Sequence, residues 1–173
     1  TYKVNMVPMY ISMGMSQGIM PLISYNYASG NHKRMKKTVM FAARTALCFL
    51  IAVAIIYYTA AHGIISLFMD NASIVDYGTR FLRGFCLGLP FLCVDFLAVG
   101  VFQAVGMGKE ALIFAIMRKL LLEIPALCIL NFLFPLYGLA YAQLTAEVVL
   151  SIAAVIVLAR LFKRLSKFDQ KQR

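Results

Sequence analysis

The sequence predicts an all-α fold, a polytopic transmembrane helix bundle with five spans. Hydrophobic residues make up 62% of the chain and charged residues only 14%, whereas soluble domains carry about 25% charged residues. A chain this short cannot bury so much apolar surface in one soluble core. The composition therefore disfavours a soluble domain, a secreted disulfide mini-protein, a disordered tail and a nucleic-acid-binding module. No apolar run alternates with a period of two residues, which disfavours a membrane β-barrel.

Each predicted span is an apolar run close to or above the roughly 20 residues that a helix needs to cross a bilayer. The linkers between the runs are short and rich in glycine, proline or charge. Three prolines, Pro21, Pro90 and Pro125, lie inside spans one, three and four and are expected to interrupt them. The predicted spans are about 4–27, 38–67, 79–105, 110–134 and 136–161.

Basic residues are distributed unevenly over the two sets of linkers. The first linker, the third turn and the C-terminal region carry 14 of the 17 lysines and arginines, Arg118 and Lys119 being counted with the turn at Lys109. Because cytoplasmic segments are enriched in basic residues, we expect an outside N-terminus and an inside C-terminus. The net charge of +10 is then a signal of topology and gives no reason to expect nucleic acid. Residues 1–165 are expected to form the bundle and residues 166–173 a basic cytoplasmic tail.

Residues that could carry soluble enzyme chemistry are missing from the sequence. It has no nucleotide-binding glycine motif and no metal-binding His-Glu helix motif. The four cysteines lie inside apolar runs without metal-ligand spacing, which indicates packing. We therefore expect no enzyme activity, no metal site and no cofactor.

Three acidic residues lie inside predicted spans, where a charge is costly and usually faces a protein interior or a watery cavity. Asp95 and Glu147 have no basic residue three or four positions away and are the candidates for binding an ion or a proton. Glu123 follows Lys119 by four residues, a spacing that favours a structural ion pair. The alternative for all three is a neutral or hydrogen-bonded buried carboxyl.

Several motifs occur in the order found in one transporter family. Span one and its linker read Gly14-Met-Ser-Gln17-Gly18-Ile-Met-Pro21-Leu-Ile-Ser-Tyr25-Asn26-Tyr27, then Ala28-Ser29-Gly30-Asn31 and Arg34. This resembles the eighth helix of multidrug and toxic compound extrusion (MATE) transporters, except that Ala28-Ser29 replaces the usual Gly-Ala. Four later segments resemble the loop before helix ten, the end of helix ten, helix eleven and the entry to helix twelve. They are Leu67–Arg83, Phe102–Lys109, Arg118 with Ile124-Pro125, and Leu136–Ala140.

The MATE resemblance implies a twelve-helix transporter of two lobes, of which this chain corresponds to helices eight to twelve. It implies a secondary antiporter in a bacterial plasma membrane that exports cationic or amphipathic compounds in exchange for sodium ions or protons. The N-terminal lobe and helix seven would be missing partners. Asp95 matches a helix-ten acid of the cation site in some members, and Glu147 matches a helix-twelve acid. The motif residues expected to line the substrate cavity or to shape the helices are Gln17, Pro21, Asn26, Gln103 and Glu123.

Two other functions remain open from the sequence. One is a flippase for lipid-linked oligosaccharides in the same superfamily, although such proteins tend to have more cations in the cavity. The other is a five-helix membrane scaffold without transport, against which the unpaired acids Asp95 and Glu147 speak. The absence of a starting methionine and of a signal peptide leads us to expect a piece of a longer protein.

Overall fold

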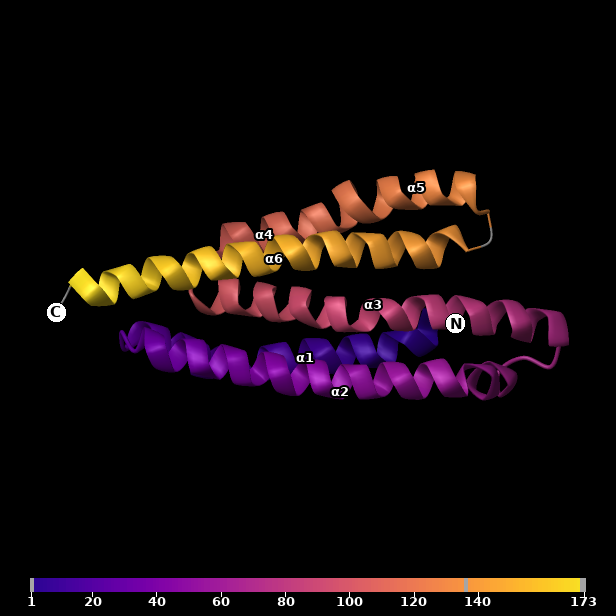
Figure 1. The fold of residues 1–173 in the computed structure, drawn as a ribbon, viewed down its shortest axis with the longest axis horizontal. Helices are drawn as coiled ribbons and strands as arrows, with labels where there is room; N and C mark the ends of the chain where they lie inside the picture. Colours follow the sequence, from indigo (N-terminus) through magenta and orange to yellow (C-terminus); the bar gives the residue numbers. More distant parts are fainter. Residues whose placement is uncertain (1, 136, 172–173) are drawn as a thin grey trace.

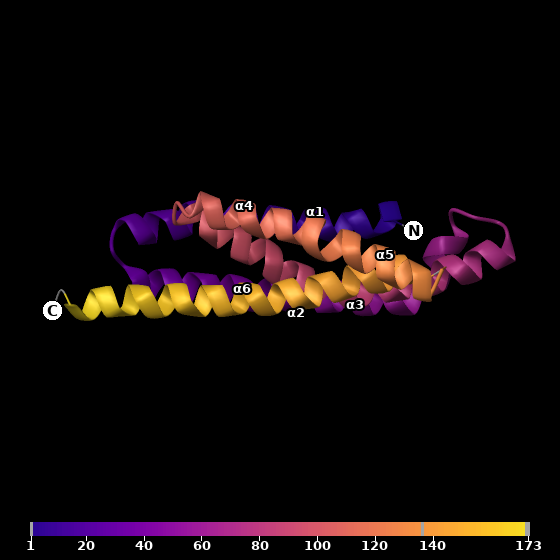
Figure 2. The same ribbon diagram turned by 90° about the horizontal axis from the view of Figure 1, so that it is seen from above.

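The computed structural model of the bundle describes residues 2–135 and 137–171, and it describes their side chains except at residues 2, 5 and 168–171. Within these residues the chain forms five helical rods and no strand (Figures 1 and 2). The fourth rod contains a π-helical segment, η1, between two α-helices. The elements are α1 (Tyr2–Ala28), α2 (His32–Ser66), α3 (Ala72–Ala104), α4 (Gly108–Ile116), η1 (Met117–Glu123), α5 (Ile124–Leu133) and α6 (Gly138–Lys171).

The helix ends follow from local sequence signals. The side chains of Asn31 and Asn71 accept hydrogen bonds from the backbone N–H groups of Arg34 and Ser73, which caps the starts of α2 and α3. Gly30 and Gly106 follow α1 and α3 with φ of +74° and +80°, the left-handed conformation that commonly closes a helix. These signals explain why the linkers are short and why consecutive rods run antiparallel.

The five rods coincide along the sequence with the five predicted apolar runs, but their bounds and regularity differ. By length and composition, α2, α3 and α6 are the described helices that could cross a membrane. The rod α1 is rich in polar side chains, and the α4–α5 rod is broken by a charged π-helical segment. The last helix continues to Lys171 and so includes part of the predicted 166–173 tail; residues 172–173 lie outside the described part.

The prolines interrupt the helices less than expected. Helices α1 and α3 run through Pro21 and Pro90 without ending. Only Pro125 coincides with a change, since η1 ends two residues before it and the Ile124 N–H donates to the carbonyl five residues back, that of Lys119. Proline cannot donate to the carbonyl four residues back and its ring crowds that turn. A turn widened by one residue accommodates it.

Helix α3 lies between α6 and the α1–α2 pair and packs along all three (Figure 1). Two glycines mark the closest approaches. A Cβ atom at Gly84 would lie 3.0 Å from Cβ of Ala140 on α6, and one at Gly100 would overlap Ser16 Oγ on α1. The Ser16 hydroxyl donates a 2.7 Å hydrogen bond to the Phe96 carbonyl, which ties α1 to α3. By contrast, a Cβ at Gly14 or Gly18 would meet nothing within 4 Å. These two glycines therefore do not contact another helix in the described part of the chain.

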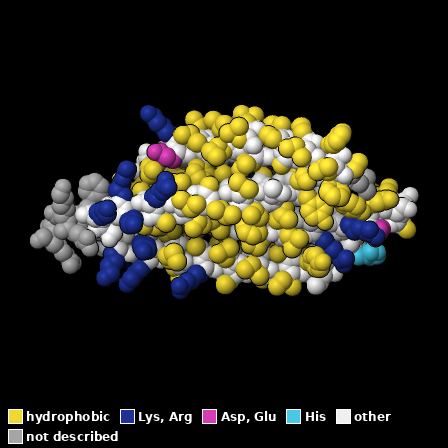
Figure 3. Space-filling view, turned by 45° about the horizontal axis from the view of Figure 1, so that its top comes forward, with side chains coloured by type: hydrophobic (Ala, Val, Ile, Leu, Met, Phe, Trp, Pro, Cys, Tyr) yellow, Lys and Arg dark blue, Asp and Glu magenta, His cyan; other side chains and the backbone are white. Residues whose placement is uncertain are grey.

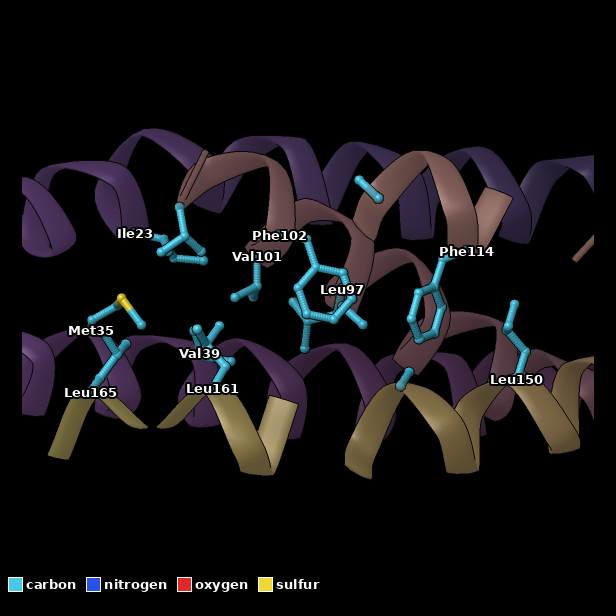
Figure 4. Close-up of a cluster of buried hydrophobic side chains, with 14 residues drawn as sticks. Ile23, Met35, Val39, Leu97, Val101, Phe102, Phe114, Leu150, Leu161 and Leu165 are labelled. Carbon is cyan, nitrogen blue, oxygen red and sulfur yellow. The ribbon is translucent and has the colours of Figure 1, made fainter. Parts of the chain in front are cut away.

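The main core lies toward the end of the bundle that holds the α1–α2 and α3–α4 turns (Figure 4). It joins side chains of α1, α2, α3, α4 and α6, with the rings of Phe102 and Phe114 5.3 Å apart. The outer surface is also apolar along the middle, and lysines and arginines gather mostly at one end (Figure 3). Such a surface is stable only against lipid or further protein. Cys86 and Cys93 are buried, as the packing interpretation predicts, while Cys48 and Cys128 are exposed.

Candidate ion-binding site

The two candidate ion-binding acids meet in the interior of the bundle. Asp95 on α3 is 1% exposed and Glu147 on α6 is 2% exposed. The close contact of Gly84 with Ala140 holds the two helices together, and the two carboxyls lie near enough to interact electrostatically. The sequence singled out both acids, and the tertiary structure makes them one site.

Arg118 is the third member of the site. Its Nη2 lies 3.3 Å from Oε1 of Glu147, with side-chain exposures of 15% and 2%. Its guanidinium carbon also lies 4.9 Å from the centre of the Phe96 ring, which favours a cation over the ring face. Arg118 therefore faces the interior, and counting it with the basic turn at Lys109 was wrong, because its partner Glu147 lies inside the bundle.

The depth of Arg118 in the bundle could have been predicted by counting residues from the turn between α3 and α4. Asp95 lies about eleven residues before Gly106, and Arg118 lies about twelve residues after it. In an antiparallel helix pair joined at that turn, the two residues stand at similar distances from the bundle end. Arg118 also belongs to η1, and π-helical segments are frequent at functional sites. The pairing with Glu147 has no comparable sequence signal, because it depends on which faces of two rods meet.

Several buried polar atoms of the site have no hydrogen-bond partner among the described residues. Within the described part of the chain, both carboxyl oxygens of Asp95, Oε2 of Glu147 and Nε of Arg118 are buried without a hydrogen-bond partner. Two ionised carboxylates against one guanidinium leave one uncompensated negative charge, which is costly away from water. One proton or one monovalent cation would balance it. The described residues contain no group of three or more His, Cys, Asp and Glu side chains that could hold a metal ion.

The other predicted site residues are not gathered at this carboxyl pair. Gln17, Pro21 and Gln103 are exposed. Asn26 is buried and donates a 2.8 Å hydrogen bond to the Leu22 carbonyl of its own helix. Glu123 accepts a 2.8 Å hydrogen bond from Lys119, in the structural pair that the spacing predicts.

A small cavity lies on the α1 side of α3. It has a volume of about 220 Å³ and is lined mainly by apolar side chains of α1, α2 and α3, including Met15, Phe41 and Leu97. The hydroxyl residues Ser12, Ser16, Thr38 and Thr45 also line it. This combination of apolar walls and a few polar groups is typical of ligand pockets, although the volume is below their usual range.

A bundle of membrane-length helices with two buried acids and an arginine in its interior is typical of one class, that of multi-pass membrane proteins that move ions or solutes. The family is shown by direct comparison, because the MatE family model matches residues 1–129. The chain therefore belongs to the MatE family, whose members are transporters and not enzymes.

Relatives agree with this assignment. The chain is 32% identical over 166 residues to the multidrug export protein MepA of Staphylococcus saprophyticus, and 34% identical over 167 residues to MepA of Staphylococcus haemolyticus. Both matches cover 96% of this chain but only 36% of the relative. The chain thus spans little more than a third of the length of these relatives.

Solved structures show the same fold. The chain superimposes on an inward-facing multidrug resistance MATE family transporter with a TM-score of 0.89 at 19% identity. The bent form of the Vibrio cholerae MATE transporter VcmN gives a TM-score of 0.88 at 17% identity. These matches cover 96% of this chain and 39% and 38% of the respective transporters.

Proposed function

We propose that this chain forms part of the second lobe of a secondary antiporter that exports cationic or amphipathic compounds in exchange for sodium ions or protons. The observation that carries the proposal is the buried group of Asp95, Glu147 and Arg118, in which one arginine faces two acids and both carboxyl oxygens of Asp95 lack a hydrogen-bond partner among the described residues. The names of the relatives, multidrug export proteins, support drugs as the exported class. A first lobe and the preceding helix would complete the transporter, as the lengths of the relatives suggest.

In this mechanism Arg118 neutralises Glu147 and leaves Asp95 to accept the coupling ion. An ion or proton on Asp95 removes the excess negative charge and so favours a closely packed arrangement of α3, α6 and η1. Without it, the uncompensated carboxylate favours an arrangement that admits water. Because a ligand shifts a conformational equilibrium by its difference in affinity for the two states, ion binding and drug release become linked.

The charge of the site favours the antiporter over the flippase alternative. When both acids are ionised the interior is net negative and attracts cations, whereas a lipid-linked oligosaccharide carries its charge as anionic phosphate. A cavity for such a substrate would need more basic side chains than Arg118 alone supplies among the buried groups described here.

Transport in membrane vesicles tests the function. Inside-out vesicles that contain the product of the complete gene are loaded with sodium ions or acidified inside, and uptake of a fluorescent amphipathic cation is followed. We expect uptake only while one of these gradients lasts, because outward drug movement is driven by inward ion movement. Uptake that is unchanged by both gradients, or that requires ATP, would contradict the proposal. The two gradients also separate sodium from proton coupling.

We further propose the N-out/C-in orientation, on the basis of the basic end of the bundle. A cysteine introduced at Ser29 in the α1–α2 turn, in a background without native cysteines, is expected to resist a membrane-impermeant maleimide in intact cells. A cysteine at Ser73, near the start of α3, is expected to react, because the bundle places it at the opposite end (Figure 1). Protection of Ser73→Cys together with labelling of Ser29→Cys would reverse the orientation.

A further inference from the structure

Away from the acid pair, a surface groove combines a cationic end with an apolar channel. Two adjoining cavities of about 320 and 330 Å³ share Tyr58 and Leu87. The first lies between α2, α3 and α6 and is lined by Arg80, Arg83 and three tyrosines. The second continues between α2 and α3 along Ile51, Ala54, Ile55, Cys86 and Pro90.

The guanidinium of Arg83 is held in place yet keeps free donors. Its Nε donates a 3.3 Å hydrogen bond to the Tyr58 carbonyl, and its carbon lies 5.1 Å from the centre of the Tyr58 ring. Among the described residues, its two terminal nitrogens make no further hydrogen bond or ion pair. A planar fork oriented in this way suits the bidentate binding of a phosphate group.

Arg80 adds a second positive charge that is readily available. It pairs with Asp76 at 3.2 Å, but the two side chains are 62% and 60% exposed. An exposed pair of this kind contributes little free energy, so Arg80 can turn toward an anion at small cost. Asp76 compensates one of the two arginines and leaves a net positive charge at this end of the groove.

We propose that this groove binds one phospholipid, with its phosphate on Arg83 and one acyl chain along Ile51, Ile55 and Pro90. Tyrosine and arginine side chains are typical of the region where hydrocarbon meets lipid headgroups. Pro90 lies seven positions after Arg83, so the apolar part extends roughly 10 Å along α3 beyond the cationic end. Its exposed walls, Ile51, Ile55 and Leu87, match an acyl chain better than any water-soluble anion.

Native mass spectrometry of the product of the complete gene tests the site, with phosphatidylglycerol added to the detergent-solubilised protein. We expect one bound lipid, with binding about tenfold weaker in Arg83→Gln because a charge-assisted contact is lost. Arg83→Lys keeps the charge without the fork and is expected to fall between the two. Arg164→Gln, which removes an exposed arginine of α6 outside the groove, is the matched control and should bind like the wild type.

A second variant tests the apolar part of the groove. Ala54→Trp fills the channel and should weaken phosphatidylglycerol and phosphatidylcholine alike, since both have acyl chains. Glycerol phosphate, which lacks the acyl chains, should not compete. Equal binding by the Arg83→Gln and Arg164→Gln variants, full competition by glycerol phosphate, or no bound lipid because other protein covers the groove would each overturn the proposal. Efflux is measured separately, so this result is independent of the transport proposal.

Discussion

The substitution Asp95→Asn is expected to reduce drug efflux at least about tenfold, to the level of cells without the transporter. Asparagine has nearly the shape of aspartate but cannot carry the negative charge that an ion or proton would balance. The Glu147–Arg118 pair remains intact and neutral, so the bundle should still fold. The measurement is the rate of dye efflux from intact cells at equal amounts of membrane protein.

Asp76→Asn provides the matched control for this experiment. Asp76 undergoes the same chemical change, but its side chain is 60% exposed and pairs with Arg80 at the surface. Efflux by the Asp76→Asn variant should stay close to that of the wild type. Wild-type efflux in Asp95→Asn at normal protein levels would exclude Asp95 as the coupling residue.

Replacing Arg118 by methionine is expected to lower stability more than a surface change of the same type. Loss of the guanidinium leaves Glu147 without its partner in a buried site, and breaking such a pair costs on the order of 3 kcal/mol. The double variant Arg118→Met/Glu147→Met should recover most of the loss, because two apolar side chains replace the pair. The measurement is the apparent melting temperature in detergent, with Arg164→Met as the exposed control.

A second readout separates ion binding from mere stability in Arg118→Met. Without the arginine, Asp95 and Glu147 attract a cation more strongly, so the concentration of coupling ion that gives half-maximal transport should fall. Release of the ion should slow, and the maximal rate should fall with it. An unchanged half-maximal concentration, or a double variant no more stable than the single one, would show that Arg118 is not coupled to the carboxyls.

Much of the fold could be predicted from the sequence because hydropathy acts locally. A run of some 20 apolar residues needs a lipid environment whatever its neighbours are. The rods accordingly follow the predicted spans to within several residues at most ends, and the Lys119–Glu123 pair appears at its predicted spacing. The C-terminal helix extends further than predicted, because helix formation does not require apolar residues and the charged segment after Leu161 remains helical.

The candidate site was only partly predictable. Asp95 and Glu147 could be singled out because a charged side chain in an apolar run is costly. No local sequence pattern near either residue predicts that the two lie close together. Arg118 looked like a cytoplasmic charge because it stands next to Lys119 and close to a basic turn. Adjacent residues on a helix point in different directions, so Lys119 faces outward to Glu123 while Arg118 faces inward to Glu147.

The sequence by itself determined a five-rod membrane bundle, the transporter family resemblance and the two acids that carry an unfavourable charge. Those properties depend on composition and on order along the chain. The tertiary structure decided that Asp95, Glu147 and Arg118 form one site, that η1 precedes Pro125, and that Gly100 rather than Gly18 brings α1 against α3. The physical reason is that contacts between rods depend on their rotation and register, which are decided by packing across the whole bundle.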